Sequence, residues 1–209
     1  MKKYFSLLIS FLILGSVLFN VARADSDPVS MLTSVADQMI ASLKQNKATL
    51  KTNPSLVYSL ANRIIVPHAD LAEMSKRVLP PQTWASATPA QRSQFQREFS
   101  TLLVRTYASA LAEYKDQTVK FFPVRGGYQG KSTVQVNSQI ERSDGPSIAV
   151  TYSLVQRGSG WRLYDMTVEG VSMLESFRSQ FADKLSQGDM AALLRDLQQH
   201  NRTHGGSSS

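Results

Sequence analysis

The sequence predicts an α+β fold, in which several helices pack on one face of a curved, four-stranded antiparallel meander. Three observations predict this class. Apolar residues recur at helical spacing over a long stretch from residue 89 to about residue 115. Four β-rich segments follow, separated by short turns rich in Gly, Asp and Ser. Between Trp161 and Phe181 the apolar period then changes from that of a strand to that of a helix.

The first 24 residues have the pattern of a cleaved secretory signal peptide. A basic start at Lys2 and Lys3 precedes an apolar run over residues 7–18, and Ala22-Arg23-Ala24 has the small residues of a cleavage motif. We expect cleavage after Ala24. The alternative is an uncleaved anchor, although the run is short for a membrane span. No cysteine follows, so we do not expect a lipoprotein anchor.

Charge and the absence of cysteine narrow the function classes. Cleavage would leave 185 residues with 20 basic and 16 acidic side chains, a formal charge of +4. This length suits one domain, which we place at 25–199, followed by a disordered polar tail at 200–209. Nucleic acid is not an expected partner, because no basic stripe is present. A chain without cysteine forms no disulfides, which is ordinary for an exported bacterial protein.

Three helices are expected in the N-terminal third. Asp27 and Pro28 have the residue types of a helix start, and Asn53 and Pro54 begin a second helix that ends at Pro67. A polar run separates these two helices, and a short third helix covers about 69–78. The apolar positions of the three helices are Leu32, Val35, Met39, Leu43, Leu56, Leu60, Ile64, Leu71, Met74 and Val78.

A long helix is expected from Thr88 to about Lys115, after a break at 79–82. Thr88 and Gln91 form a capping box around Pro89 at the first helical position. The i, i+4 row of this helix forms a broad apolar face. It consists of Phe95, Phe99, Leu103, Tyr107 and Leu111.

The meander and the corner that follows it complete the domain. Alternation of apolar and small or polar residues from Ile148 to Leu154 indicates a sheet with one covered face. Gly170 marks the corner, Ser172 and Glu175 can cap the next helix, and a last helix begins near Asp189. The expected strands are 118–124, 132–141, 148–156 and 161–169. The apolar face of the helix after the corner consists of Val171, Leu174, Phe177, Phe181 and Leu185.

Signals for catalysis or metal binding are weak. His200 and His204 are spaced to share a metal on one helix face, but they lie in a polar segment, which favours incidental surface histidines. His68 has no partner constellation in the sequence. Asp165 and Glu169 share one face of a strand and could be paired carboxylates for acid–base chemistry, although two solvent-facing side chains are the more ordinary interpretation.

Two motifs carry a resemblance to a known family. The first is Ser86 to Arg92 with the Phe95, Phe99 and Tyr107 row, and the second runs from Tyr164 through Glu169-Gly170-Val171-Ser172-Met173. In both motifs, and in the order of its elements, the chain resembles the MlaC family of periplasmic phospholipid-binding proteins, also called the toluene-tolerance family. The match extends over nearly the whole chain after the leader.

The resemblance implies a periplasmic, monomeric carrier without enzyme activity, metal or cofactor. Such a carrier passes glycerophospholipid between an outer-membrane lipoprotein–porin complex and an inner-membrane ABC transporter with a substrate-binding ring protein, and so maintains outer-membrane lipid asymmetry. The acyl chains would lie in an apolar cavity between the helices and the sheet. Two alternatives stay open: a cone-shaped enzyme acting on an apolar small molecule, and an interaction module with a solid core.

The residues expected to line this cavity are inferred from periodicity. They are the apolar side chains that the helices and the sheet would turn toward each other. They are Leu71, Met74, Val78, Trp84, Phe95, Phe99, Leu103, Tyr107, Phe121, Val134, Val136, Val150, Tyr152, Tyr164, Met166, Val168, Val171, Leu174 and Phe177.

Overall fold

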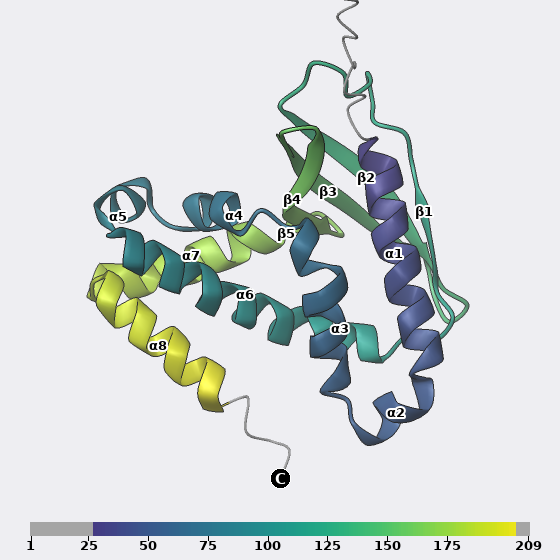
Figure 1. Ribbon diagram of the computed structural model, residues 1–209, viewed down its shortest axis with the longest axis horizontal. Helices are drawn as coiled ribbons and strands as arrows, with labels where there is room; N and C mark the ends of the chain where they lie inside the picture. The colour runs from purple at the N-terminus through teal and green to yellow at the C-terminus, as the bar shows by residue number, and fades with distance from the viewer. Residues whose placement is uncertain (1–26, 204–209) are drawn as a thin grey trace, which may run out of the picture.

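The computed structural model describes residues 27–203, so the expected signal peptide lies outside the described residues. The described chain forms an antiparallel sheet with helices on one face and beside it (Figure 1). Its elements are α1 (Pro28–Gln45), α2 (Lys47–Thr52), α3 (Leu56–Ile64), η1 (Val66–His68), α4 (Leu71–Val78), α5 (Pro81–Ser86), α6 (Pro89–Ala112), β1 (Thr118–Phe121), β2 (Thr133–Glu141), β3 (Ile148–Arg157), β4 (Gly160–Val168), β5 (Val171–Ser172), α7 (Met173–Gln187) and α8 (Met190–Thr203).

The sheet is a meander with the strand order β1-β2-β3-β4-β5, and all neighbours are antiparallel. It therefore has five strands in the described residues, where the sequence predicted four. The extra strand pairs Val171 with Val168 across a two-residue turn. Glu169 and Gly170 in this turn have φ values of 49° and 84°, the consecutive left-handed residues of a tight hairpin. Val171 thus belongs to a strand, and not to the helix face on which it was expected.

Smaller differences concern the ends of the elements. Helix α2 occupies the segment expected to be a polar run, and Leu50 gives it a buried apolar contact. Helix α5 begins within the expected break, and the half-buried Trp84 gives it an apolar contact. Helix α6 ends at Ala112, three residues before the expected end. Helix α8 continues to Thr203, so the first four residues of the expected tail are helical, and 204–209 lie outside the described residues.

The helices do not all cover the sheet. In Figure 1, α1 lies against one face of the sheet, while α4 to α8 gather to one side of it, next to β4 and β5. Helix α6 is the central element of this group and contacts α3, α4 and α8. On β2 the covered face alternates, since Val134 and Val136 are buried and Gln135 is exposed. On β3 the predicted alternation is interrupted at Ser153, which is buried beside Leu154 at a register shift.

The buried apolar residues form three separate clusters. The helical cluster joins α4 to α8. The α1–α3 cluster contains Leu43, Leu60 and their neighbours, together with Ala108 of α6. The sheet cluster packs Leu32 of α1 against Trp161 and the covered face of β2 to β4. The buried core of the described residues is therefore divided, and α6 and β4 lie where the clusters meet.

The capping box of α6 forms as predicted. The Thr88 hydroxyl accepts from the Gln91 amide at 3.2 Å, and the Gln91 side chain accepts from the Thr88 amide at 2.9 Å.

We expect Thr88→Ala to lower the free energy of unfolding by about 1 kcal/mol, because the first turn of α6 loses this cap. Thr106→Ala, at an exposed position within the same helix, is the control. It should leave stability unchanged or raise it by up to about 0.5 kcal/mol, since alanine is the better helix former. Denaturant unfolding of both variants tests the pair, and an equal loss in both would contradict the capping role.

Candidate functional site

Most of the predicted lining residues lie in the helical cluster. Its centre is a set of aromatic rings, in which Phe99 packs against Phe95, Phe177 and Phe181 at centroid distances of 5.5–5.6 Å. Tyr107 extends this set and meets Phe177 edge-on at 6.2 Å. The predicted residues in or against this cluster are Leu71, Met74, Val78, Trp84, Phe95, Phe99, Leu103, Tyr107, Tyr164, Leu174 and Phe177.

The other predicted residues divide between the sheet cluster and positions outside all three clusters. Phe121, Val134, Val136 and Tyr152 belong to the sheet cluster, where the Phe121 and Tyr152 rings lie 5.6 Å apart. Val150 is buried, and Met166 and Val168 are half-buried on the same sheet face. Val171 is 63 % exposed, so the structure does not place it with the others.

Strand β4 is the wall that the helical and sheet clusters share. Leu163 packs against the sheet cluster, whereas the next residue, Tyr164, packs against the helical cluster. Ordinary alternation places these two neighbouring side chains on different sides of β4. A register shift opposite them, between Ser153 and Leu154 of β3, leaves Tyr164 as the extra residue of a β-bulge. Backbone contacts fix the helices here, because the Asp70 amide donates to the Leu163 carbonyl at 2.8 Å.

Half-buried apolar side chains follow this wall, and we call them the boundary residues. They come from α4, α6, β3 and β4. They are Leu71, Tyr107, Tyr152, Leu163, Tyr164, Met166 and Val168.

The boundary residues themselves are uncharged. Burial raises the pKa of the Tyr152 phenol, and burial together with the nearby Asp165 carboxylate raises the pKa of Tyr107. Both phenols are therefore neutral at physiological pH, and each presents an aromatic ring with a single polar tip. Such a boundary suits a hydrocarbon ligand better than a charged one.

Asp165 and Glu169, the carboxylates considered for acid–base chemistry, both hold the corner between the sheet and α7. Asp165 accepts from the Ser172 hydroxyl at 2.7 Å and from the Leu174 amide at 3.1 Å. Glu169 accepts from the Ala149 amide. Asp165 therefore positions the start of α7, and Glu169 holds the β4–β5 turn against β3.

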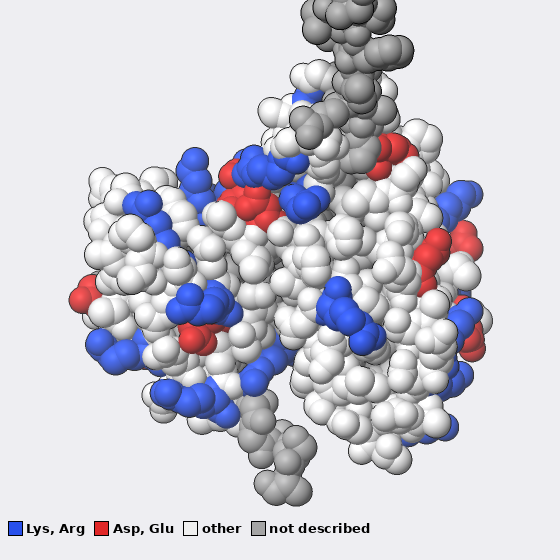
Figure 2. All heavy atoms as spheres, in the orientation of Figure 1, with Lys and Arg blue, Asp and Glu red and all other residues white. Residues whose placement is uncertain are grey.

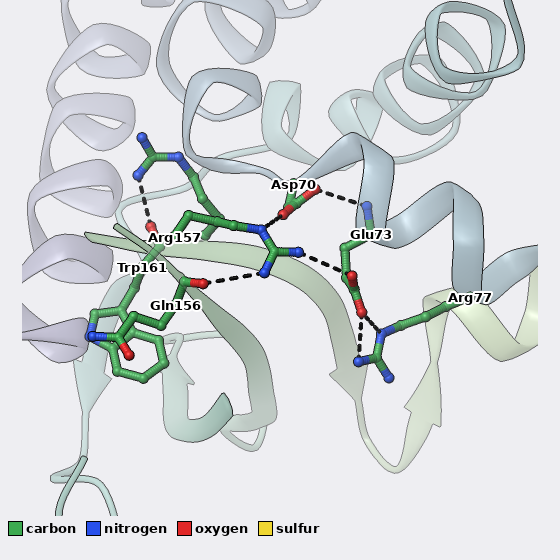
Figure 3. Close-up of polar contacts among 7 residues, drawn as sticks. Asp70, Glu73, Arg77, Gln156, Arg157 and Trp161 are labelled. Carbon is green, nitrogen blue, oxygen red and sulfur yellow. Dashed lines mark hydrogen bonds and ion pairs between the residues drawn. The ribbon is translucent and has the colours of Figure 1, made fainter. Parts of the chain in front are cut away.

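An ionic network fastens the β3–β4 hairpin to α4 (Figure 3). Arg157 donates to the carboxylates of Asp70 at 2.6 Å and of Glu73 at 3.0 Å. Glu73 also pairs with Arg77 at 2.7 Å, and the Arg77 guanidinium lies 4.2 Å from the ring centroid of Tyr164. The network thus spans the outer end of the boundary, and Figure 2 shows a mixed group of acidic and basic side chains over this region. The sequence pattern did not predict it, because its members are 84 and 87 residues apart.

We expect Asp70→Ala to lower the free energy of unfolding by about 2 kcal/mol, because Asp70 also caps α4 by accepting from the Glu73 amide. Arg157→Ala should lower it by about 1 kcal/mol, since this side chain is 46 % exposed and its charge is partly screened. Arg178→Ala is the control: its ion pair with Glu175 is exposed, and no measurable change is expected. Equal effects of Arg157→Ala and Arg178→Ala in thermal unfolding would contradict a fastening role.

The histidines do not gather into a site within the described residues. His200 lies in α8, and His204 lies outside the described part of the chain. Partial burial and the nearby Arg162 lower the pKa of His68, which favours its neutral form. Residues 27–203 contain no group of three or more His, Asp or Glu side chains placed to hold a metal ion. None of the helices in this range is long and apolar enough to cross a membrane.

Two surface depressions of about 410 Å³ each lie on the described part of the chain. One runs along the polar side of α1, from Val29 to Gln38. The other lies over the polar side of β2 and reaches Tyr164. Neither is an enclosed space between the helices and the sheet.

Comparison with known proteins gives consistent results for sequence and fold. Residues 33–199 match the family model described as MlaC protein. The chain is 30 % identical over 164 residues to the toluene tolerance protein ttg2D of Pseudomonas putida, covering 78 % of this chain and 75 % of that one. It is 26 % identical to the intermembrane phospholipid transport system binding protein MlaC of Haemophilus influenzae, covering 95 % and 93 %.

A solved structure extends the similarity to three dimensions. It is a phospholipid-binding protein from Ralstonia solanacearum in complex with a phospholipid, with a TM-score of 0.78 and 30 % identity. The match covers 86 % of this chain and 99 % of the Ralstonia chain. The helices and the sheet described above therefore recur together in a protein that holds a phospholipid.

Proposed function

This chain belongs to the MlaC family, and we propose that it is a phospholipid carrier that holds the acyl chains of a glycerophospholipid along the boundary residues. The observation that carries the proposal is the similarity to the Ralstonia protein, which contains a bound phospholipid and matches nearly its full length. The names of both curated relatives agree with a role in lipid transport or solvent tolerance.

The division of the core supports acyl chains at the boundary. Separating the helical cluster from the sheet cluster along β4 would expose two apolar walls, and acyl chains entering between them would cover these walls again. Two chains hold roughly thirty methylenes, and each methylene contributes about 0.8 kcal/mol when removed from water. A ligand of this kind can therefore offset the free energy of opening the core, whereas water cannot.

Hydrocarbon binding needs few polar groups along the chains, which fits the neutral phenols of Tyr107 and Tyr152 at the boundary. We therefore propose that the volume of the acyl chains determines selectivity, that the headgroup lies near the mouth, and that no catalytic step, metal or cofactor is involved. Comparable affinity for lipids with one and with two chains would count against selection by volume.

We further propose the cellular setting that the family implies. A signal peptide at 1–24 would direct the chain to the periplasm, where a monomer would carry lipid between an outer-membrane lipoprotein–porin complex and an inner-membrane ABC transporter with a ring protein. This traffic would maintain outer-membrane lipid asymmetry. Nucleic acid is not a proposed partner.

A vesicle assay tests the carrier function. Donor vesicles containing pyrene-labelled phospholipid are mixed with unlabelled acceptor vesicles, and the loss of excimer fluorescence reports transfer. We expect the transfer rate to rise in proportion to protein concentration, with heat-unfolded protein as the control. A rate that does not depend on folded protein would contradict the proposal.

A further inference from the structure

The depression over β2 has the chemistry of an anion site. Its lining comes from the β1–β2 loop, the outward face of β2, and the β4 wall, and its volume of about 410 Å³ lies in the lower range of ligand pockets. The lining contains two cations and no Asp or Glu. It consists of Val124, Arg125, Lys131, Thr133, Val134, Gln135, Asn137 and Tyr164.

The strand pattern explains why polar groups gather here. Because side chains alternate along β2, Val134 and Val136 enter the sheet cluster while Thr133, Gln135 and Asn137 form a row on the opposite face. The Asn137 side-chain oxygen accepts from the Thr151 hydroxyl at 2.8 Å. This bond leaves the Asn137 amide hydrogens for an acceptor from outside.

The two cations differ in how they are held. The Lys131 ammonium donates to the Gly126 carbonyl at 3.2 Å and to the Arg125 carbonyl at 3.5 Å, which fixes its position in the loop. The Arg125 guanidinium makes no hydrogen bond or ion pair with the other described residues, so its donors are free for a ligand. Fork-shaped guanidinium donors are well matched to phosphate oxygens, and charge-assisted bonds of this type are the strong ones.

We propose that this depression binds a phosphate-ester group through Arg125, Lys131 and the Asn137 amide. This chemistry is shared by the headgroup of a phospholipid and by a free phosphate ester. Only the headgroup source rests on the proposed carrier function.

Nuclear magnetic resonance of the whole domain tests the site with two probes. The first is sn-glycerol 3-phosphate, titrated into protein whose backbone amides are ¹⁵N-labelled. The second is protein loaded from phosphatidylglycerol vesicles, with lipid stoichiometry measured separately by extraction. We expect saturable shifts of the Thr133, Gln135 and Asn137 amides with at least one probe. Shifts with glycerol phosphate indicate a free ester, and shifts only in loaded protein indicate the headgroup.

Matched variants separate this site from general charge. The double variant Arg125→Ala with Lys131→Ala should raise the dissociation constant of the probe by about tenfold or more, or abolish the shifts. Arg125→Ala alone should also weaken binding. The Arg125 guanidinium holds no part of the loop, so this single variant should keep the loop folded. Lys51→Ala with Arg63→Ala removes the same charge from exposed positions on α2 and α3 and should leave binding unchanged.

Three outcomes would overturn the proposal. They are equal losses in the two double variants, no effect of Arg125→Ala, and an absence of shifts at these amides with both probes. Normal lipid stoichiometry without shifts from either probe would reject the anion site and leave the carrier function intact. Failure of lipid loading with intact glycerol phosphate shifts would reject the carrier function alone.

Discussion

Replacement of Phe99 by alanine is expected to lower the free energy of unfolding by about 4 kcal/mol, the usual range for removing a buried aromatic ring. The Phe99 side chain is fully buried, and its ring centroid lies 5.5 Å from those of Phe95 and Phe177. The substitution would leave a cavity between α6 and α7, and the surrounding rings can close it only in part. Since a domain of this size has a stability of about 5–15 kcal/mol, the loss is a large share of the total.

Urea unfolding followed by circular dichroism measures this effect. Arg97→Ala is the control, because Arg97 is exposed on the same helix, and its substitution should change stability by less than about 0.5 kcal/mol. A loss below about 1.5 kcal/mol for Phe99→Ala would contradict the close packing of the aromatic rings in the helical cluster.

The second large effect concerns the boundary. Met166→Asp is expected to reduce phospholipid binding by at least about a hundredfold, because a carboxylate without a partner is strongly disfavoured against hydrocarbon. Met166 is half-buried on the sheet face that includes Tyr152, its pairing partner on β3. Folding should survive, since the side chain lies outside the three buried clusters.

Ser179→Asp is the control for this prediction. Ser179 is exposed on α7, so the substitution adds the same charge away from the boundary residues and from the depression over β2. We expect the Ser179 variant to take up phospholipid from vesicles like the unmodified protein. Uptake that is equal in the two variants would place the acyl chains elsewhere.

Local sequence patterns predicted much of the fold because the determining residues lie close together. The capping box between Thr88 and Gln91 fixed the start of α6, and alternation along the strands identified the covered face of the sheet. Strand β5 was missed because two residues are too short to show a period. Its turn also requires Glu169 in a left-handed conformation, which only the neighbouring Gly170 indicated.

The candidate site was predictable only in part. Periodicity shows which side chains are apolar, but it does not show which partner each one meets. For this reason it did not predict the division into clusters, in which Leu163 and Tyr164 belong to different ones. The pairing of Arg157 with Asp70 likewise depends on tertiary structure, since an arginine at the end of a strand carries no local signal for a helix cap far along the chain.

Native mass spectrometry of protein isolated from the periplasm of a bacterial host, with lipid extraction from the same sample, tests the central claim most directly. The proposed function predicts a mass excess of one or more whole phospholipids per chain, with the same lipids recovered in the extract. Protein that has only its own mass, and that also fails to take up labelled phospholipid from liposomes, would contradict a phospholipid carrier.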